Sequence, residues 1–454
     1  MSGNSPNSAG TEAREVDWLL FNADWLVVCD SGMNRFRSGA VAIEADRIVS
    51  VGPSDELKRT FRGRREMNLG GHLLMPGLVN THTHAAMSLF RGLADDLPLR
   101  NWLEDIIFPA EATWIDGDAV YLGTILSALE MLKGGTTTFC DGYFFEERAA
   151  EAALESGIRA VLGQGILDFP APDQPDPARW RERTDSFLSF FPGKTDRIRP
   201  SLFCHAPYTC GPETMQNVKA LCRENDILFQ THLSESSGEV GEILARYSKR
   251  PVIYLAELGI LDELTLCAHG IWLSAEERAG LAAAKTSIAH CPESNMKLGS
   301  GVAPLTALFR SGVRVGLGTD GCASNNDLDL FTEMDKAAKL AKVFDNDPLA
   351  CPAEQTLSMA TLTGASTLGL AAEVGSIETG KKADLIALDL DQPHLTPLYD
   401  PVSHLVYSAR GSDVRFVWVD GQLVVAKGSV LTIDEPGVLA EARRMAGRIA
   451  RRIT

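Results

Sequence analysis

Short apolar, partly β-branched runs alternate with amphipathic stretches through the middle of the chain, from residue 74 to residue 372. Eight of the runs have the length of a strand, and the stretches between them place apolar residues at helical spacing. The runs are LLMPGLVNTH, TTTFCDGY, RAVLGQGILD, RPSLFCHAPY, ILFQTHLSE, LTLCAHG, TSIAHCPESN and VRVGLGTDG. Eight strand–helix units over roughly 300 residues predict an α/β fold, a (β/α)8 barrel of the TIM type.

The two ends of the chain have a different pattern. Residues 17–73 and 373–430 contain short alternating or β-rich pieces with turns, such as the VDG turn in VRFVWVDGQLVVAKG. We expect these ends to pair with each other as one small composite β-sandwich domain. Residues 431–454 include the stretch EPGVLAEARRMAGRIARRIT, which has Pro near its start, apolar residues at helical spacing and basic residues last, and this predicts a C-terminal helix. Residues 1–16 are polar and are expected to be a disordered leader, not a signal peptide.

Charge and composition exclude several classes of partner. The chain has 454 residues and a formal net charge of −17, so no basic stripe is available for a nucleic-acid backbone. No run of about 18 apolar residues is present, so we expect no membrane span. The nine cysteines are dispersed without a CxxC pair, which favours buried free thiols and a cytoplasmic location.

Polar residues stand at the ends of the expected barrel strands. In a (β/α)8 barrel the carboxyl ends of the strands form the active-site face. Six of the nine histidines fall there, whereas His72, His394 and His404 do not. In strand order the polar residues are His82 and His84, Asp141, Gln164, His205, His232 followed by Glu235, His269, His290, and Asp320. Scattered core histidines would not segregate in this way, so the pattern predicts a catalytic metal site.

The ligand types indicate the metal. His82 and His84 are two residues apart on one strand, so their side chains point to the same face. Together with His232 and Asp320 they offer three imidazoles and a carboxylate, a set suited to one divalent zinc, or to iron(II). We expect Asp320 and Glu235 also to move protons, and His269 to orient the attacking water, although His269 could be a further ligand. Asp141 and His290 are more simply interpreted as hydrogen-bonded residues of the barrel rim.

At this point the chain resembles the amidohydrolase superfamily, through MPGLVNTHTH, HAPYTC, THLSE, CAHG, HCPESNMKLGSG and GTDGCASNNDLD. Members with two metals commonly carry a carboxylated lysine after strand four. That strand here reads SLFCHAPYTC without lysine, and Lys133 precedes strand two at the opposite end of the barrel, so one metal is expected.

Within the superfamily, AMSLFRGLADDLPLRNWLEDIIFPAE is similar to the deaminases of 5′-methylthioadenosine and S-adenosylhomocysteine. The resemblance implies that Glu111 binds the ribose hydroxyls, that Trp102 packs near the nucleoside and that His205 hydrogen-bonds the purine. It also implies attack of an activated water on C6 of adenine, with Glu235 protonating the ring nitrogen and then the departing amine. A homo-oligomer is expected as well.

One position departs from that family. Some members that act on S-adenosylhomocysteine have arginine where Gln164 stands in RAVLGQG, and that arginine holds the amino-acid carboxylate. Gln164 can hydrogen-bond the substrate but carries no charge. Unless Arg179 or Arg181 compensates, we expect a preference for 5′-methylthioadenosine or adenosine over S-adenosylhomocysteine.

Three other interpretations use the same pattern. Relatives of this architecture dechlorinate triazines or deaminate guanine, 8-oxoguanine, cytosine or pterins, but a bare base has no ribose for Glu111 to hold. A non-catalytic scaffold would have lost the ligand residues, which are all present here. A cyclic-amide hydrolase is disfavoured by the missing lysine of strand four.

Overall fold

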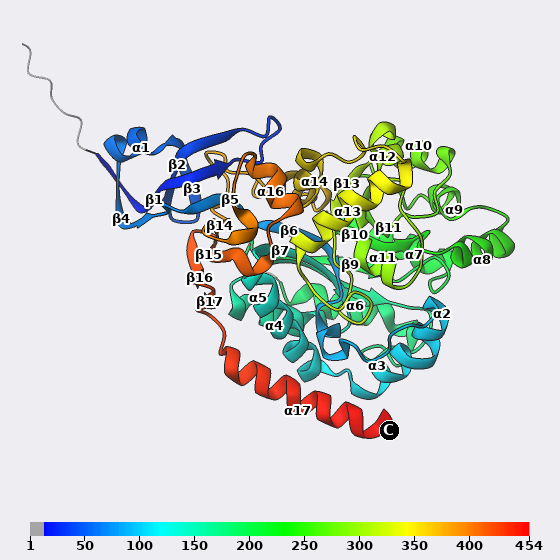
Figure 1. Ribbon diagram of the computed structural model, residues 1–454. Coiled ribbons are helices and arrows are strands. Elements are labelled where there is room, and N and C mark those ends of the chain that lie inside the picture. Colours follow the sequence, from blue (N-terminus) through cyan, green and yellow to red (C-terminus); the bar gives the residue numbers. More distant parts are fainter. Residues whose placement is uncertain (1–12, 192, 194, 454) are drawn as a thin grey trace, which may run out of the picture.

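A barrel of eight parallel strands forms the centre of the molecule (Figure 1). The computed structural model describes residues 13–191, 193 and 195–453. The strands lie side by side in sequence order: β6 (Leu78–Thr83), β7 (Thr136–Tyr143), β8 (Arg159–Ile166), β9 (Ile198–Cys204), β10 (Leu228–Leu233), β11 (Thr265–His269), β12 (Ser287–His290) and β13 (Arg314–Leu317). Thr81 Oγ1 donates to Leu317 O at 2.9 Å and Thr319 N donates to His82 O at 3.0 Å, so the barrel is nearly closed. The predicted fold is confirmed.

Helices follow the barrel strands and cover the outside. Strands β7, β8 and β10 are buried at every position, as expected for parallel strands covered on both faces. Several helices begin with a side-chain cap: Asp116 accepts from Ala119 N, and Ser236 from Glu239 N. The helices are α4 (Gly117–Lys133), α5 (Glu146–Ser156), α6 (Trp180–Ser189), α7 (Pro212–Asn225), α8 (Ser237–Tyr247), α9 (Pro251–Glu257), α10 (Ala275–Ala283), α11 (Pro292–Lys297), α12 (Leu305–Ser311), α13 (Leu330–Asp345), α14 (Ala353–Met359) and α15 (Leu362–Thr367).

The first expected barrel strand is in fact two strands. The run LLMPGLVNTH divides at Gly77, so that β5 (His72–Pro76) belongs to the sheet of the chain ends and β6 starts the barrel. A Cβ on Gly77 would lie 2.1 Å from Thr137 Oγ1, and Gly77 N donates to Asp384 O. Only glycine fits at this crossing. We therefore propose Gly77 as the start of the barrel, in place of residue 74.

The two chain ends form a separate mixed sheet, shown in blue and orange in Figure 1. Strand β5 pairs with β1 on one side and with β14 on the other, and hydrogen bonds connect all nine strands into one sheet. Its core includes Trp18 and Trp418, which pack edge to face. The elements are β1 (Arg14–Val27), β2 (Arg35–Glu44), β3 (Arg47–Pro53), β4 (Phe61–Asn68), β14 (Leu385–Asp389), β15 (Val414–Val419), β16 (Gln422–Ala426) and β17 (Ser429–Val430), with α1 (Ser54–Thr60) and α16 (Pro401–Tyr407).

The terminal segments differ slightly from expectation. Strand β1 begins at Arg14, so residues 14–16 of the expected leader belong to the sheet, whereas residues 1–12 lie outside the described residues. The C-terminal helix α17 (Glu435–Ile453) begins at Glu435, whose Oε1 accepts from Lys133 Nζ of α4 at 2.7 Å. All nine cysteines are buried free thiols, as predicted. Among the described residues, every helix is too short or too polar to cross a membrane.

A helical segment lies over the mouth of the barrel between β6 and α4. It consists of α2 (Leu99–Asn101), a π-helix η2 (Trp102–Ile107) and α3 (Phe108–Trp114), and we call these residues 99–114 the roof. A short 3-10 helix, η1 (Ala85–Phe90), precedes it. The wide turn of the π-helix lies directly before Pro109, which has no N–H to donate. The roof buries Trp102, Ile107 and Glu111 toward the barrel.

Candidate active site

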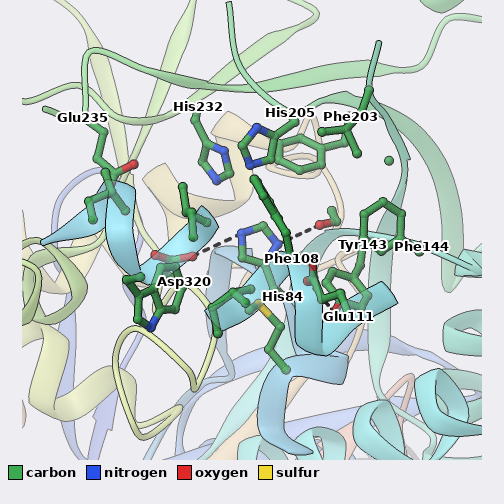
Figure 2. A pocket seen from close by; sticks show the side chains of 18 of the residues that line it. His84, Phe108, Glu111, Tyr143, Phe144, Phe203, His205, His232, Glu235 and Asp320 are labelled. Carbon is green, nitrogen blue, oxygen red and sulfur yellow. Dashed lines mark hydrogen bonds and ion pairs between the residues drawn. The ribbon is translucent and has the colours of Figure 1, made fainter. Parts of the chain in front are cut away.

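Four of the expected ligands come together at the carboxyl ends of the strands. One ligand atom from each of His82, His84, His232 and Asp320 lies within 4.8 Å of the others. The two histidines of β6 approach Asp320 Oδ1 through Nε2, at 3.6 Å for His82 and 3.2 Å for His84. Figure 2 shows His84, His232 and Asp320 on the wall of one pocket.

Hydrogen bonds from neighbouring loops orient these side chains. His84 Nδ1 donates to Gly142 O at 2.7 Å, which in the neutral ring leaves a lone pair on Nε2. Asp320 Oδ2 accepts from Ser294 Oγ at 2.6 Å and from Ser324 Oγ at 2.8 Å. The two serines occupy one carboxylate oxygen of Asp320, and the other oxygen faces the imidazoles.

The donor set fits a divalent metal. His82 Nε2 is buried and has no hydrogen-bond partner among the described residues, although it lies 3.6 Å from Asp320 Oδ1. Burial lowers the pKa of His82 to about 4 and that of His232 well below its usual value, so both offer neutral lone pairs. Burial alone would raise the pKa of Asp320, but the nearby imidazoles of His82 and His84 hold it well below its usual range. Three imidazole nitrogens and one ionised carboxylate match the ligands of a catalytic zinc site.

His84 differs from the other two histidines. Burial disfavours its charged form, yet Asp320 raises the pKa of His84 to about 9. A positive charge is thus stabilised at the place where His84 Nε2 faces Asp320 Oδ1. A divalent cation bound there would pair with the same carboxylate. A proton and a metal ion therefore compete for this position.

Glu235 and His269 face each other beside the ligand group. His269 Nε2 lies 3.7 Å from Glu235 Oε2, and both residues line the pocket. His269 Nδ1 donates to Asn295 Oδ1 at 2.8 Å, because a carboxamide oxygen only accepts. In a neutral ring the lone pair then lies on Nε2. Burial raises the pKa of Glu235, which brings this carboxyl closer to the range in which it can both take up and release a proton.

The pocket itself joins the barrel mouth to the roof. It has a volume of about 680 Å³ including its open mouth. In Figure 2, Glu235 and Asp320 lie at one end and Glu111, Tyr143 and Phe144 at the other. Such a hollow has the size of a small-molecule site with convergent polar groups. Of the sequence-predicted site residues, the lining includes His84, Trp102, Glu111, His205, His232, Glu235, His269 and Asp320.

Glu111 is the buried acid of the roof. Its Oε1 accepts from the hydroxyl of Tyr143 at 2.7 Å, which ties the roof to strand β7. Burial raises the pKa of Glu111 to about 7, although the Tyr143 hydrogen bond opposes the shift. Trp102 is buried in the same wall, and its Nε1 has no hydrogen-bond partner. Both residues are therefore placed to contact a ligand.

His205 lies on the wall just after strand β9. Its Nδ1 is 2.9 Å from Thr209 Oγ1, and its ring is 4.9 Å from that of His232. Burial lowers the pKa of His205 to about 3, so the ring is a neutral hydrogen-bonding group. Figure 2 shows it between the two ends of the pocket.

Gln164 and the two arginines do not line the pocket. Gln164 Nε2 donates to Gly165 O and to Asp173 Oδ2, so the amide is engaged behind the wall. Arg179 donates to Glu182, and Arg181 donates to Asp185 at 2.9 Å, on an exposed surface. The direct substrate contact predicted for Gln164 is thus without geometric support.

The remaining predicted residues lie outside the pocket lining. Asp141 Oδ1 accepts from Ala85 N and Gly142 N, which agrees with a hydrogen-bonded rim residue. His290 is buried at the end of β12, but its Nδ1 has no hydrogen-bond partner among the described residues, so the hydrogen bonding expected at this position is not seen. Lys133 pairs with Glu435 on the outside of the barrel, and the lining contains no lysine among the described residues.

Several supporting residues were not found from the sequence. Ser294 and Asn295 lie on α11 after the motif histidine of β12, Tyr143 ends β7, and Ser300 and Ser324 lie in loops. Their residue types carry no special signal, and each except Ser324 bonds a residue distant in sequence. The conspicuous HCPESN motif was the available signal for Ser294 and Asn295.

Comparisons with known proteins agree with this geometry. The amidohydrolase family matches residues 73–424, and an imidazolonepropionase-like composite domain of bacteria matches residues 39–63. The chain is 46% identical to a 5-methylthioadenosine/S-adenosylhomocysteine deaminase of Syntrophobacter fumaroxidans, over 96% of this chain and 98% of that protein. It is 43% identical to a 5′-deoxyadenosine deaminase of Methanothermobacter thermautotrophicus, over 91% and 95%.

Among solved structures, an adenosine deaminase from Xanthomonas campestris with bound zinc superposes with a TM-score of 0.94. It is 37% identical to this chain, and the match covers 97% of this chain and 100% of that structure. The match to the family profile spans most of the chain, including the eight strands and every ligand residue. The chain therefore belongs to the amidohydrolase family.

Proposed function

We propose that the protein is a metal-dependent aminohydrolase that replaces the amino group of the adenine ring of a nucleoside, with release of ammonia. The observation that carries the proposal is the arrangement of one pocket. Asp320 of the ligand group lies with Glu235 at one end of the pocket, His84 and His232 lie on its wall, and the buried carboxyl of Glu111 lies at the other end. The names of the similar proteins point to the same reaction.

We propose zinc as the metal, with iron(II) as the alternative. The four ligand residues suit zinc, and the similar adenosine deaminase contains it. When bound, such a metal lowers the pKa of a water and supplies the nucleophile.

Glu235 and His269 move the protons of this reaction. Water adds to C6, the bond from C6 to the exocyclic nitrogen breaks, and ammonia leaves. Glu235 carries one proton of the attacking water to the adjacent ring nitrogen, where it stays in the product. Glu235 then carries the remaining proton of the C6 hydroxyl to the departing amine, so that ammonia leaves and a carbonyl oxygen remains on C6. His269 presents Nε2 as an acceptor because Asn295 holds its Nδ1–H, so it can orient the attacking water. His205 is placed to hydrogen-bond the purine.

Glu111 and the roof select the rest of the nucleoside. An ionised Glu111 can accept from ribose hydroxyls, while Tyr143 holds one of its oxygens. Next to Glu111 lies a second, apolar hollow, which we call the annex; it shares lining residues with the pocket and is lined by Phe108, Phe144, Leu167, Phe169 and Pro170, among others. Glu111 is the one ionisable group among the described residues that line the annex.

An annex of this kind favours a small or apolar 5′-substituent. The α-carboxylate of S-adenosylhomocysteine would meet apolar side chains and the acidic Glu111, with no cation to compensate. We therefore propose 5′-methylthioadenosine, 5′-deoxyadenosine or adenosine as the substrate class. This preference rests on the annex, not on Gln164.

The test is ammonia release by the zinc-loaded protein on a panel of adenosine, 5′-deoxyadenosine, 5′-methylthioadenosine, S-adenosylhomocysteine, guanine, 8-oxoguanine, cytosine and a chlorotriazine. We expect an adenine nucleoside to be the best substrate. Glu235→Gln should lower kcat by about 10²–10⁴-fold with the metal retained, and Glu242→Gln, on the exposed face of α8, should have no effect. Turnover of a bare base or triazine alone would contradict the proposal. A higher kcat/KM on S-adenosylhomocysteine would contradict the preference.

A further inference from the structure

Glu239 is a buried carboxyl that no step above uses. It lies in the first turn of α8, four residues after Glu235, and is 5% exposed. Its Oε1 accepts from Ser234 N at 2.7 Å, and its Oε2 accepts from Glu235 N at 2.8 Å. Both carboxylate oxygens thus bind consecutive amides of the turn that carries Glu235.

This contact is not the usual one for an acid at the start of a helix. In a capping box the third-residue glutamate returns to the N–H of the N-cap residue. Here Ser236 is the N-cap, and its Oγ accepts from Glu239 N at 3.1 Å. The Glu239 carboxylate does not bond the N–H of Ser236 but those of the two residues that precede Ser236. The helix is therefore capped by Ser236, and the carboxylate holds the turn.

The turn needs such support. Ser234 has a φ of 51°, a left-handed conformation that costs free energy for a residue other than glycine. The side chain of Glu235 is weakly held by comparison, since Ser300 Oγ donates to Oε1 at 3.4 Å and His269 lies 3.7 Å from Oε2. A side chain that carries protons must reach more than one atom, so it is held by few contacts of its own. Its direction then depends on the position of the backbone that carries it.

We propose that Glu239 is a positioning residue, which fixes the backbone of Glu235 so that its carboxyl is aimed at the reacting atoms. The inference rests on the proposed function only in giving Glu235 the role of proton carrier. In Glu239→Gln one oxygen is replaced by an NH2 group, which cannot accept and would face a backbone N–H. The Ser234–Glu235 turn would then lose one of the two hydrogen bonds that its amides donate to Glu239, while the bonds from Ile271 N and Trp272 N to Ser234 O remain.

The experiment compares kcat, KM and metal content for Glu239→Gln, Ser236→Ala and Glu242→Gln. We expect Glu239→Gln to lower kcat by about 10- to 100-fold, because small misplacements of a catalytic group have effects of that size. KM and metal content should be unchanged. Ser236→Ala removes the helix cap of α8 without touching the turn, and Glu242→Gln changes an exposed acid one turn later. Equal losses in Glu239→Gln and Ser236→Ala would overturn the proposal, since they would indicate a merely structural role for the helix.

A double variant separates positioning from general damage. If Glu239 acts through Glu235, Glu239→Gln should change kcat by less than about twofold in a Glu235→Gln background. Additive losses would overturn the proposal.

Hydrogen exchange supplies a readout that does not depend on activity. Exchange at the amides of Ser234 and Glu235 should be faster in Glu239→Gln and unchanged in Ser236→Ala. Unchanged exchange in Glu239→Gln would overturn the inference. A wild-type protein without activity on adenine nucleosides would remove the proposed function, while the exchange comparison would still decide the role of Glu239 in the turn.

Discussion

The floor of the pocket, made by the carboxyl ends of the strands, and the roof above it are built in different ways. On the floor, polar side chains are held by hydrogen bonds from neighbouring side chains, as Ser294 and Ser324 hold Asp320 and Asn295 holds His269. The roof is an irregular helix with a π-turn, and its pocket side is apolar apart from Glu111. The floor thus carries the groups of one reaction, whereas the roof can select substrates by the shape of its apolar surface and by one acidic side chain.

The difference predicts that substitutions in the floor and in the roof will affect activity in two distinct ways. A change in the floor should lower turnover of every substrate alike, because the reacting centre is common to all of them. A change in the roof should depend on the substrate, because each substrate presents a different sugar or 5′-group to it.

Of the three tests of this difference, the largest effect is expected for the floor variant that combines Ser294→Ala with Ser324→Ala. It leaves Asp320 Oδ2 without its two hydroxyl donors. Loss of such supporting hydrogen bonds typically lowers metal affinity or activity by about 10- to 100-fold. Chelator competition and kcat on three nucleosides would measure it, with Ser311→Ala on α12 as the control. A loss confined to one nucleoside would break the distinction between floor and roof.

A smaller and selective effect is expected for Glu111→Gln in the roof. The kcat/KM for adenosine should fall by about 10-fold or more, mainly through KM, because a hydrogen bond to a charged acceptor is replaced by a weaker one. Turnover of 2′,3′-dideoxyadenosine, which has no ribose hydroxyls, should hardly change. Glu104→Gln, an exposed acid of the same segment paired with Arg100, is the matched control. Equal losses on both nucleosides would show that Glu111 does not read the ribose.

The smallest effect concerns stability and follows from the same glutamate. Burial raises the pKa of Glu111 from 4.5 to about 7 in the folded protein. Its contribution to stability is therefore fully present below pH 4.5 and is lost as the pH rises through about 7, by about 3 kcal/mol at most. Glutamine carries no charge at either pH.

The Tm of Glu111→Gln relative to wild type should therefore rise by roughly 2–4 °C between pH 5 and pH 8. Thermal unfolding without substrate at both pH values would measure it, with Glu104→Gln as the reference. A difference that is the same at both pH values would contradict the buried, raised-pKa state of Glu111.

The parts predicted from the sequence are those with a local signal. The eight barrel strands were identified because strands buried on both faces are continuous apolar runs, and the ligand histidines interrupt those runs at one end. The division at Gly77 was missed because apolar residues continue across it, and only the approach of Thr137 distinguishes the two strands.

The parts that were missed depend on side-chain direction and on contacts across loops. Gln164 lies on a strand that lines the pocket, but its amide turns to Asp173, which is set by the loop after β8. Glu239 follows Ser236 at capping-box spacing, which by itself marks only a helix start. That the Glu239 carboxylate reaches past Ser236 to the Glu235 turn is visible only in three dimensions.

The shared sheet of the two chain ends has a consequence for synthesis. The barrel strands pair with their neighbours in sequence, so each can dock on the one before it as the chain leaves the ribosome. Strand β5, in contrast, pairs Leu73 with Leu388 of β14, and this ladder closes a loop that contains the whole barrel. One edge of β5 therefore has no partner strand until most of the chain has been synthesised. The sheet of the chain ends can be completed only after the whole barrel has been made.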